Sequence, residues 1–352
     1  MPTSPQIKIG LGTLAQAGSF FAVRGRLLVV TRGTAMERWL PELAASLKEA
    51  GMGEDQIEVF SGFGINPRVE DMQQAAAGLA TGPDAGGAGF EAVLGFGGGS
   101  AIDAAKALVH YAGLKAQVFA LPSIVGTGSE QTSFAALYQG TGKISLAAPE
   151  LLPTRVLVDA ELYRQAPPEV KNAPAVDCLC QAVESFWAKG ATDRSRAYAL
   201  DCLRLCAETM RKYVMTQDAE AALHMGRASA LSGMAINIAK TTASHALSYG
   251  LSTRYGISHG QAVALTLPGL FAFNQDAVPE LPRMLKALGL HRAEDFRSWF
   301  QELLRDVGLK TSIADFDLPD FDAGVLADGV NLERLGNNPK PLGRGDLMAL
   351  FG

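Results

Sequence analysis

Short apolar runs alternate with helix-like stretches through the first 160 residues, and this alternation limits the possible folds more than any other feature. The runs are rich in β-branched and aromatic side chains, as buried strands are, and they are bounded by turn residues. Strands that alternate with helices in this way indicate a mostly parallel sheet covered by helices, the α/β class. The expected strands are Leu27–Thr31, Ile57–Phe60, Ala92–Phe96, Val118–Leu121 and Arg155–Val158, and the expected helices are Ala35–Ala50, Val69–Ala80 and Ser100–Tyr111.

A different pattern follows Pro167 and Pro168. From Ala175 almost to the C-terminus, apolar residues recur at helical spacing and few strand-like runs remain. A chain of 352 residues also exceeds the size at which one hydrophobic core usually stops growing. We therefore expect an α/β domain over residues 1–162 and an all-α domain over residues 163–352. Within the first domain, residues 81–89 are expected to form a surface loop and residues 138–146 a small hairpin.

The charge balance and the apolar pattern exclude two classes of partner. The 31 basic and 36 acidic side chains give a net charge of −5, and no Lys/Arg cluster could follow a nucleic-acid backbone. No stretch approaches the ~18 apolar residues of a membrane span, and the N-terminus lacks a signal-peptide pattern. We therefore expect a cytoplasmic protein that binds neither nucleic acid nor a membrane.

The four cysteines lie close together in the sequence, within a stretch of helical pattern. They are grouped as Cys-x-Cys and Cys-x3-Cys, which could bind zinc. Residues two apart on a helix face different directions, however, and this favours a second interpretation as small buried side chains. The four are Cys178, Cys180, Cys202 and Cys206.

A glycine-rich turn joins the expected strand Ala92–Phe96 to the helix after it. The turn reads Gly97-Gly-Gly-Ser100, and glycine backbone allows a ligand to approach closely. The free amides at the start of the helix suit a pyrophosphate. Residues 97–100 are therefore a candidate phosphate site, with a plain strand-to-helix turn as the alternative.

A second glycine-rich turn, Leu121–Glu130, follows the expected strand Val118–Leu121. Two such turns at neighbouring strand ends would form one crevice, where ligands of open α/β sheets bind. The segment Gly126-Thr-Gly-Ser-Glu130 could also be the nucleophile elbow of a hydrolase, but it lacks a glycine two residues after Ser129. A binding crevice is therefore favoured over a hydrolase site.

These segments resemble the iron-containing alcohol dehydrogenase superfamily, whose members share their fold with dehydroquinate synthase. The similar segments follow the family's order from residue 60 to residue 260. They are Phe60-Ser-Gly-Phe-Gly-Ile-Asn-Pro67, Gly97–Lys106, Leu121–Glu130, Lys143, Val158-Asp159, Asp177-x-Leu-x-x-Ala-x-Glu184, His245-Ala-Leu and His259-Gly260.

The resemblance implies an N-terminal dinucleotide-binding α/β domain, a C-terminal helical domain and an active site in the cleft between them. It implies hydride transfer between a nicotinamide cofactor and a small aldehyde or alcohol, usually with divalent iron or zinc, and it suggests a homodimer. The positions that match the family's cofactor-binding residues are Asn66, Gly97, Gly98, Gly99, Ser100, Asp103, Ser123, Thr127, Lys143 and Leu162.

The metal site implied by the resemblance departs from the family's pattern. Asp177 and His259 match two of its ligands, but Gln181 and Thr241 stand where the family has histidines. Amide and hydroxyl oxygens are weak ligands for iron or zinc, which favour imidazole nitrogen. A hard cation, or no metal at all, is therefore an alternative, and Asp177 and Gln181 could instead form a hydrogen-bonded contact.

Without a metal, another group must stabilise the oxygen of the aldehyde. Lys240 and His245 are the candidates, because an ammonium or an imidazole can polarise a carbonyl and donate a proton. His245 also matches the family's active-site segment. Both are therefore predicted catalytic residues.

Arg32 decides which dinucleotide the sequence favours. Many NAD-using relatives have an aspartate after the strand that corresponds to Leu27–Thr31, but this chain has Arg32. A guanidinium can bind the 2′-phosphate that a carboxylate would repel, so NADP(H) is favoured over NAD(H). The alternative is a solvated surface arginine.

Several segments resemble the branch of the family that includes phosphonoacetaldehyde reductases. They are Leu179–Trp187, Lys240–Tyr249 and Asn331–Lys340. Lys240, Arg254 and Lys340 could bind an anionic substrate if the fold brings them together. Phosphonoacetaldehyde and an uncharged small aldehyde therefore both stay open as substrates.

Two other function classes are weighed against an oxidoreductase. A dehydroquinate synthase-like lyase needs an intact zinc site, against which Gln181 and Thr241 argue. A catalytically silent dinucleotide-binding protein would explain the lost ligands, but the cofactor turns are intact. Turnover of an aldehyde separates the enzyme from the silent protein.

Overall fold

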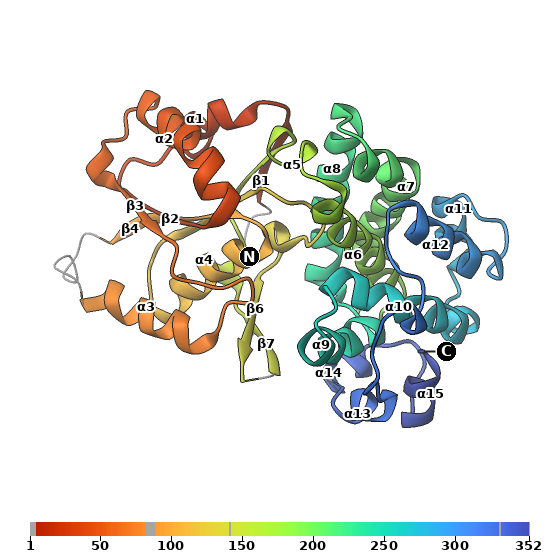
Figure 1. Cartoon of the computed structure of the whole chain (residues 1–352). Helices are drawn as coiled ribbons and strands as arrows, with labels where there is room; N and C mark the ends of the chain where they lie inside the picture. The colour runs from red at the N-terminus through yellow and green to blue at the C-terminus, as the bar shows by residue number, and fades with distance from the viewer. Residues whose placement is uncertain (1–4, 82–88, 141, 331, 352) are drawn as a thin grey trace. The chain divides into compact units, whose positions relative to one another are not determined.

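The structure is a computed structural model of the chain, and it describes residues 5–81, 89–140, 142–330 and 332–351. The chain divides into two compact units, Met1–Tyr163 and Arg164–Gly352. Residues 82–88 of the expected loop and the first residue of the segment Asn331–Lys340 lie outside those described. Figure 1 shows the elements of both units.

A six-stranded sheet, parallel throughout, forms the centre of the first unit, as the alternating pattern predicts. All five expected strands are present. The additional strand β1 was missed because its sequence, Gln6-Ile-Lys-Ile-Gly10, alternates polar and apolar residues in the manner of an edge strand. In spatial order the strands are β1 (Gln6–Gly10), β8 (Arg155–Asp159), β5 (Gln117–Pro122), β4 (Phe90–Gly97), β2 (Arg26–Thr31) and β3 (Ile57–Phe60).

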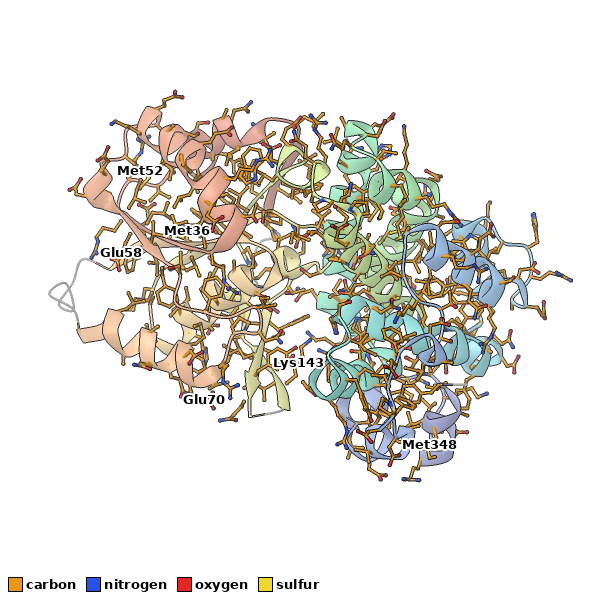
Figure 2. The ribbon with its side chains drawn as sticks, viewed as in Figure 1. Met36, Met52, Glu58, Glu70, Lys143 and Met348 are labelled. Atoms are coloured by element: carbon orange, nitrogen blue, oxygen red, sulfur yellow. The ribbon has the colours of Figure 1, made fainter. Side chains whose placement is uncertain are left out.

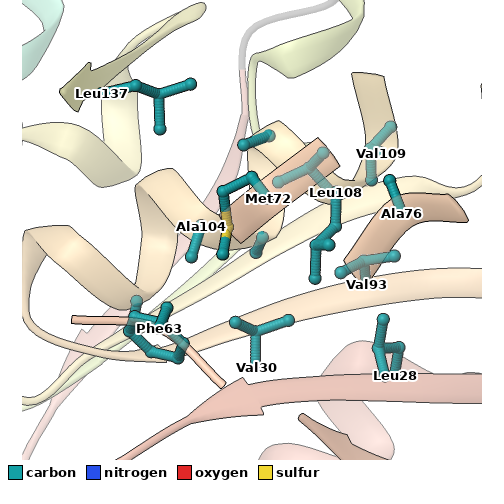
Figure 3. Close-up of a cluster of buried hydrophobic side chains, with 14 of the residues drawn as sticks. Leu28, Val30, Phe63, Met72, Ala76, Val93, Ala104, Leu108, Val109 and Leu137 are labelled. Carbon is teal, nitrogen blue, oxygen red and sulfur yellow. The ribbon is translucent and has the colours of Figure 1, made fainter. Parts of the chain in front are cut away.

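Helices cover both faces of this sheet, with α1 and α2 on one face and α3 and α4 on the other (Figure 1). Side chains of the sheet, of α3 and of α4 pack together in one hydrophobic core (Figure 3). Leu28 and Val93 of the sheet, Met72 of α3 and Leu108 of α4 are all buried there. The helices are α1 (Ala17–Phe21), α2 (Leu40–Glu49), α3 (Val69–Thr81) and α4 (Gly99–Tyr111), and α2 is preceded by the π-helical turn η2 (Ala35–Trp39).

The expected hairpin is present as a two-stranded antiparallel sheet, β6 (Phe134–Gln139) and β7 (Gly142–Ala147). It follows the second glycine-rich turn, and Leu137 packs into the core under α4. Lys143 lies on β7 (Figure 2). The remaining short turns are η1 (Thr13–Gln16), η3 (Glu54–Gln56), η4 (Ser129–Gln131) and η5 (Pro149–Leu151).

The second unit is helical, as expected from the change in pattern. Its first helix, α6, begins at Pro168, earlier than the expected Ala175, because proline at the first helical position needs no amide partner. In the part of the chain that is described, no helix is long and apolar enough to cross a membrane. The helices are α6 (Pro168–Trp187), α7 (Asp193–Met215), α8 (Ala219–Ala239), α9 (Ala243–Tyr255), α10 (His259–Asn274), α11 (Leu281–Leu288), α12 (Asp295–Asp306), α13 (Ala323–Asp328), α14 (Leu332–Gly336) and α15 (Arg344–Ala349), with α5 (Glu161–Arg164) at the division and the turns η6 (Gln275–Ala277) and η7 (Ile313–Asp315).

The strand order places a topological switch point between β2 and β4. From β2 the chain moves outward to β3, whereas from β4 it moves in the opposite direction to β5. The loops after β2 and β4 therefore leave the sheet in opposite directions. Such a point, at the carboxyl ends of the strands, is where open α/β sheets bind ligands.

Candidate functional site

The turn after β4 has a backbone that requires glycine. Gly97 has φ +152°, and a Cβ atom there would lie 2.8 Å from Cβ of Ala101. A Cβ atom on Gly99 would lie 3.0 Å from Oγ1 of Thr127. Gly98 is the N-cap of α4, so the first amides of that helix are directed at this turn. The turn thus presents bare backbone and a helix N-terminus at the switch point.

The two glycine-rich turns and the segment after β3 are joined at this edge of the sheet. The amide of Ser123 donates to the carbonyl of Gly97 over 2.9 Å, and the hydroxyl of Ser100 donates to the carbonyl of Ile65. Asn66, the next residue, is exposed. The structure therefore brings Ser100, Ser123 and Thr127 to one place.

Arg32 lies at the end of β2, on the other side of the switch point from the Gly97 turn. Its side chain is exposed, and the guanidinium carbon is 5.8 Å from the centroid of the Phe63 ring. Leu162, by contrast, is buried in α5, and Lys143 is half-buried on β7. Of these three predicted cofactor residues, Arg32 is the one placed at the switch point.

The carboxylate of Asp103 is buried and is hydrogen-bonded within the first unit. Its carboxylate accepts from the hydroxyl of Ser129 over 2.5 Å and from the amide of Ala136 over 3.0 Å. Burial raises the pKa of Asp103, although the charge of Lys106 opposes that shift. Asp103 therefore shapes the second turn from within α4.

In the second unit, three side chains converge from three helices. Asp177 lies on α6, His245 on α9 and His259 at the start of α10. Oδ1 of Asp177 is 3.3 Å from Nε2 of His245 and 4.0 Å from Nε2 of His259. One ligand atom from each of the three residues lies within 4.8 Å of the others. We call this set the Asp177 group.

Glu184 fixes the orientation of His245. Its carboxylate is fully buried and accepts from Nδ1 of His245, from the amide and hydroxyl of Thr242, and from the amide of Ser244. Because a carboxylate accepts only, Nδ1 carries the proton. Nε2 of His245 is buried and makes no hydrogen bond within the described residues, and it points at Asp177.

The electrostatic environment of His245 favours its charged form. Burial lowers the pKa of His245, but the carboxylates of Glu184 and Asp177 outweigh that effect and raise the pKa to about 9. Two negative groups thus surround one imidazole. The Asp177 group therefore attracts a cation, whether a proton or a metal ion.

Gln181 and Thr241 have other partners. Gln181 Nε2 donates to Oδ2 of Asp177 over 2.9 Å, and its Oε1 accepts from Ser232. Oγ1 of Thr241 accepts from Arg334 over 3.4 Å. Gln181 thus holds the carboxylate of Asp177 in place, and Thr241 is hydrogen-bonded to Arg334.

Lys240 adopts a strained backbone. Its φ of +62° is one of two positive values at non-glycine positions in the described chain, and the other is at Ala22. Its Nζ is 3.4 Å from the carbonyl of Asn237. Such conformations cost of order 1–3 kcal/mol and cluster at functional sites.

The other two predicted cations make contacts of their own. Lys340 Nζ donates to the carbonyl of Phe273 over 2.8 Å and lies 4.4 Å from that ring's centroid. Arg254 is exposed, with its guanidinium 5.9 Å from the Tyr255 centroid. Neither contact joins them to Lys240.

Sequence reasoning missed three residues that shape these sites. Lys106 and Glu184 are fully buried charges, and a charge within an apolar helical pattern is a signal for such a role. Asn337 donates to the carbonyls of Ala239 and Thr241, on either side of Lys240. Its sequence context, an Asn-Asn-Pro run, gave no such signal.

Comparison with family models accounts for nearly the whole chain. A model described as "Iron-containing alcohol dehydrogenase" matches residues 4–160. A second, described as "Fe-containing alcohol dehydrogenase family, C-terminal", matches residues 172–352.

Individual relatives agree with the family models. The long-chain-alcohol dehydrogenase 1 of Geobacillus thermodenitrificans is 29% identical, over 92% of this chain and 88% of its own. The phosphonoacetaldehyde reductase of Streptomyces viridochromogenes is 30% identical, over 67% of this chain and 63% of its own. The structure of sulfoacetaldehyde reductase from Bifidobacterium kashiwanohense in complex with NAD+ is similar with a TM-score of 0.87, at 25% identity, covering 100% of this chain and 97% of that one.

Proposed function

The chain belongs to the iron-containing alcohol dehydrogenase family, so it is an alcohol or aldehyde oxidoreductase, and we propose that it is a metal-dependent, NADP(H)-using reductase of small aldehydes. The observation that carries the proposal is the Asp177 group, in which Nε2 of buried His245 is aimed at Asp177 without a hydrogen bond of its own. Buried polar atoms are nearly always satisfied, so an atom left in this state needs an explanation.

A divalent iron or zinc ion fits this group. Two imidazole nitrogens and one carboxylate oxygen are the donors these metals prefer, and such a three-ligand set is typical of catalytic sites. We propose Asp177, His245 and His259 as the ligands. When bound, the ion would polarise the carbonyl oxygen of the aldehyde.

The surrounding residues prepare these three side chains for the ion. Glu184 keeps the proton of His245 on Nδ1, so the lone pair of Nε2 faces the group. Gln181 holds Oδ2 of Asp177, and Ser248 lies 3.3 Å from Nδ1 of His259. Each proposed ligand thus has a partner that fixes its direction. Gln181 is then a positioning residue, and the loss of the family's histidine at this position need not abolish the site.

The dinucleotide is assigned to the switch point of the first unit. The amides after Gly97 suit its diphosphate, since a Cβ atom at Gly97 or Gly99 would crowd the turn. Arg32, at the end of β2, is exposed and available to a 2′-phosphate, which supports NADP(H) over NAD(H). When bound, the nicotinamide supplies or accepts the hydride.

Lys240 is the proposed proton donor to the reduced oxygen. An ammonium group next to the Thr241–His245 segment can donate a proton as the alkoxide forms. The strained backbone at Lys240 supports a functional role. Replacement by methionine should lower kcat while leaving metal content unchanged.

The substrate proposal rests on the named relatives. Phosphonoacetaldehyde reductase and sulfoacetaldehyde reductase both act on two-carbon aldehydes with an anionic group. We propose a small aldehyde as substrate, with phosphonoacetaldehyde as the first to test. An uncharged aldehyde such as propionaldehyde is the comparison, since the other relative is an alcohol dehydrogenase of long-chain alcohols.

The test is oxidation of NADPH and of NADH with each aldehyde, on protein stripped with a chelator and then reloaded with Fe²⁺ or Zn²⁺. We expect activity only after reloading and a lower KM for NADPH. Arg32→Ala should raise the KM for NADPH but not for NADH, whereas Arg38→Ala, on the exposed turn η2, should change neither. Full activity in the stripped protein would refute the metal site, and binding of NADPH without turnover would favour a silent binding protein.

A further inference from the structure

A second convergence of ligand-type side chains lies in the helical unit. Cys178 of α6 and Cys202 and Cys206 of α7 bring their sulfurs together. The Sγ atoms are 3.5 Å apart for Cys178 and Cys202, and 3.9 Å apart for the other two pairs. All three side chains are fully buried. We call this set the thiol triangle.

The helices explain why these three sulfurs meet. Cys202 and Cys206 are four residues apart, so they lie on one face of α7, and that face packs on α6 at Cys178. Cys180, two residues further along α6, is equally buried but does not belong to the triangle. The expectation that all the cysteines are small buried side chains holds for their burial, but it did not foresee that three of them contact one another.

The dimensions of the triangle match those of a metal site. The point equidistant from the three sulfurs lies about 2.2 Å from each, and a metal–thiolate bond is about 2.3 Å long. An ion could therefore bind all three sulfurs close to their plane without a large movement of α6 or α7.

The three thiols can supply a set of sulfur ligands to one ion, which would take the place of their protons. A thiolate is the form that binds metals.

We propose that Cys178, Cys202 and Cys206 form a binding site for a soft monovalent ion, Cu⁺, coordinated by three sulfurs. Thiolates select soft ions, and Cu⁺ is satisfied by few ligands. Zinc almost always takes four, and among the described residues no other His, Cys, Asp or Glu belongs to the triangle. Binding forms copper–sulfur bonds and releases thiol protons to solvent, with no change of oxidation state. The site is independent of the proposed function, because the Asp177 group contains no sulfur.

The experiment uses reduced protein under argon, both as purified and refolded from urea with Cu⁺, because the triangle is fully buried. The protein then competes with bicinchoninate, whose Cu⁺ complex is coloured. We expect one Cu⁺ per chain for the unaltered protein and for Cys180→Ser, a matched control on the same helix. Cys202→Ser should bind at least tenfold more weakly.

A second variant, Cys206→Ala, is tested in case Cys202→Ser does not fold. The thermal unfolding of each variant is recorded without metal to show which of them are folded. A folded Cys206→Ala or Cys202→Ser protein that retains Cu⁺ as well as Cys180→Ser would overturn the proposal. So would refolded, unaltered protein that takes up no Cu⁺. Asp177→Ala should retain the Cu⁺ site, which separates this result from the fate of the proposed function.

Discussion

Each unit contains a cluster of charged side chains within the protein, and the two clusters differ in how completely their polar atoms are hydrogen-bonded. In the first unit, Nζ of Lys106 donates to the carbonyls of Ser129, Thr132 and Phe134 over 2.6 to 2.9 Å, while Asp103 accepts from Ser129 and Ala136. In the second, the Asp177 group surrounds an imidazole nitrogen that makes no hydrogen bond within the described residues.

This difference indicates that the cluster around Lys106 stabilises the fold and that the Asp177 group is suited to binding. Two opposite charges whose donors and acceptors are filled by nearby backbone and hydroxyl groups hold a loop in one shape, here the second glycine-rich turn and the start of β6. A cluster that leaves a buried polar atom without a hydrogen bond is suited to bind a further group, such as a metal ion. The comparison predicts a loss of stability when the first cluster is broken and a loss of binding when the second is.

The largest expected effect follows from Lys106→Met. Removing the ammonium leaves the carboxylate of Asp103 buried without its opposite charge, which typically costs about 3–5 kcal/mol of unfolding free energy. Urea denaturation measures this loss. Lys115→Met, at an exposed position, should change stability by less than about 0.5 kcal/mol.

The same experiment tests whether the pair acts as a unit. In the double variant Asp103→Asn and Lys106→Met, no unpaired charge remains, so it should be less destabilised than Lys106→Met alone. Binding of Zn²⁺ to the second unit should be the same in all these proteins, provided they are folded at the assay temperature. A loss of Zn²⁺ affinity in the folded Lys106→Met protein would contradict the separation of the two clusters.

The next effect is expected from Glu184→Gln. The donors on Thr242 and Ser244 require the amide oxygen, so the NH₂ of glutamine must face Nδ1 of His245. Nδ1 then becomes the acceptor, and the proton moves to Nε2, where the ion would bind. Metal affinity should fall about 10- to 100-fold, or about 1.4–2.7 kcal/mol.

Competition with a zinc-binding dye measures this change without reference to catalysis. Glu208→Gln, an exposed position on α7, is the matched control and should bind normally. If Glu184→Gln kept full affinity, the tautomer of His245 would not be set by Glu184, and the role assigned to that residue would be lost.

The architecture of the first unit could be predicted because apolar runs and glycine-rich turns mark its elements in the sequence. The four inner strands of the sheet, β8, β5, β4 and β2, contain continuous buried apolar runs, whereas the edge strand β1 was hidden by its alternating sequence. The glycine-rich turn after β4 was equally visible in the sequence, and the positive φ of Gly97 and the tight contact at Gly99 favour glycine there.

The details of the second cluster were less accessible. The i,i+4 spacing of Asp177 and Gln181 puts both on one face of α6, but spacing does not show which helices meet there. His245 joins Asp177 and His259 because α6, α9 and α10 pack together, a fact of tertiary structure. The thiol triangle has the same origin, since spacing alone cannot show that α7 places two cysteines against Cys178.

The smallest effect concerns pH, and it distinguishes the proton from the metal as occupant of the Asp177 group. In metal-free protein the pKa of His245 is raised from 6.5 to about 9. A raised pKa contributes stability that is fully present below pH 6.5 and is lost as the pH rises through 9. Between pH 7 and pH 8 the unfolding free energy should fall by about 1 kcal/mol more in the unaltered protein than in His245→Gln, when both are kept in chelator. With saturating Zn²⁺ the two carboxylates are already compensated, so this difference in slope should disappear. Parallel pH profiles for the two chelated proteins would mean that His245 is not held charged, and that the cluster in the second unit is as complete as the one around Lys106.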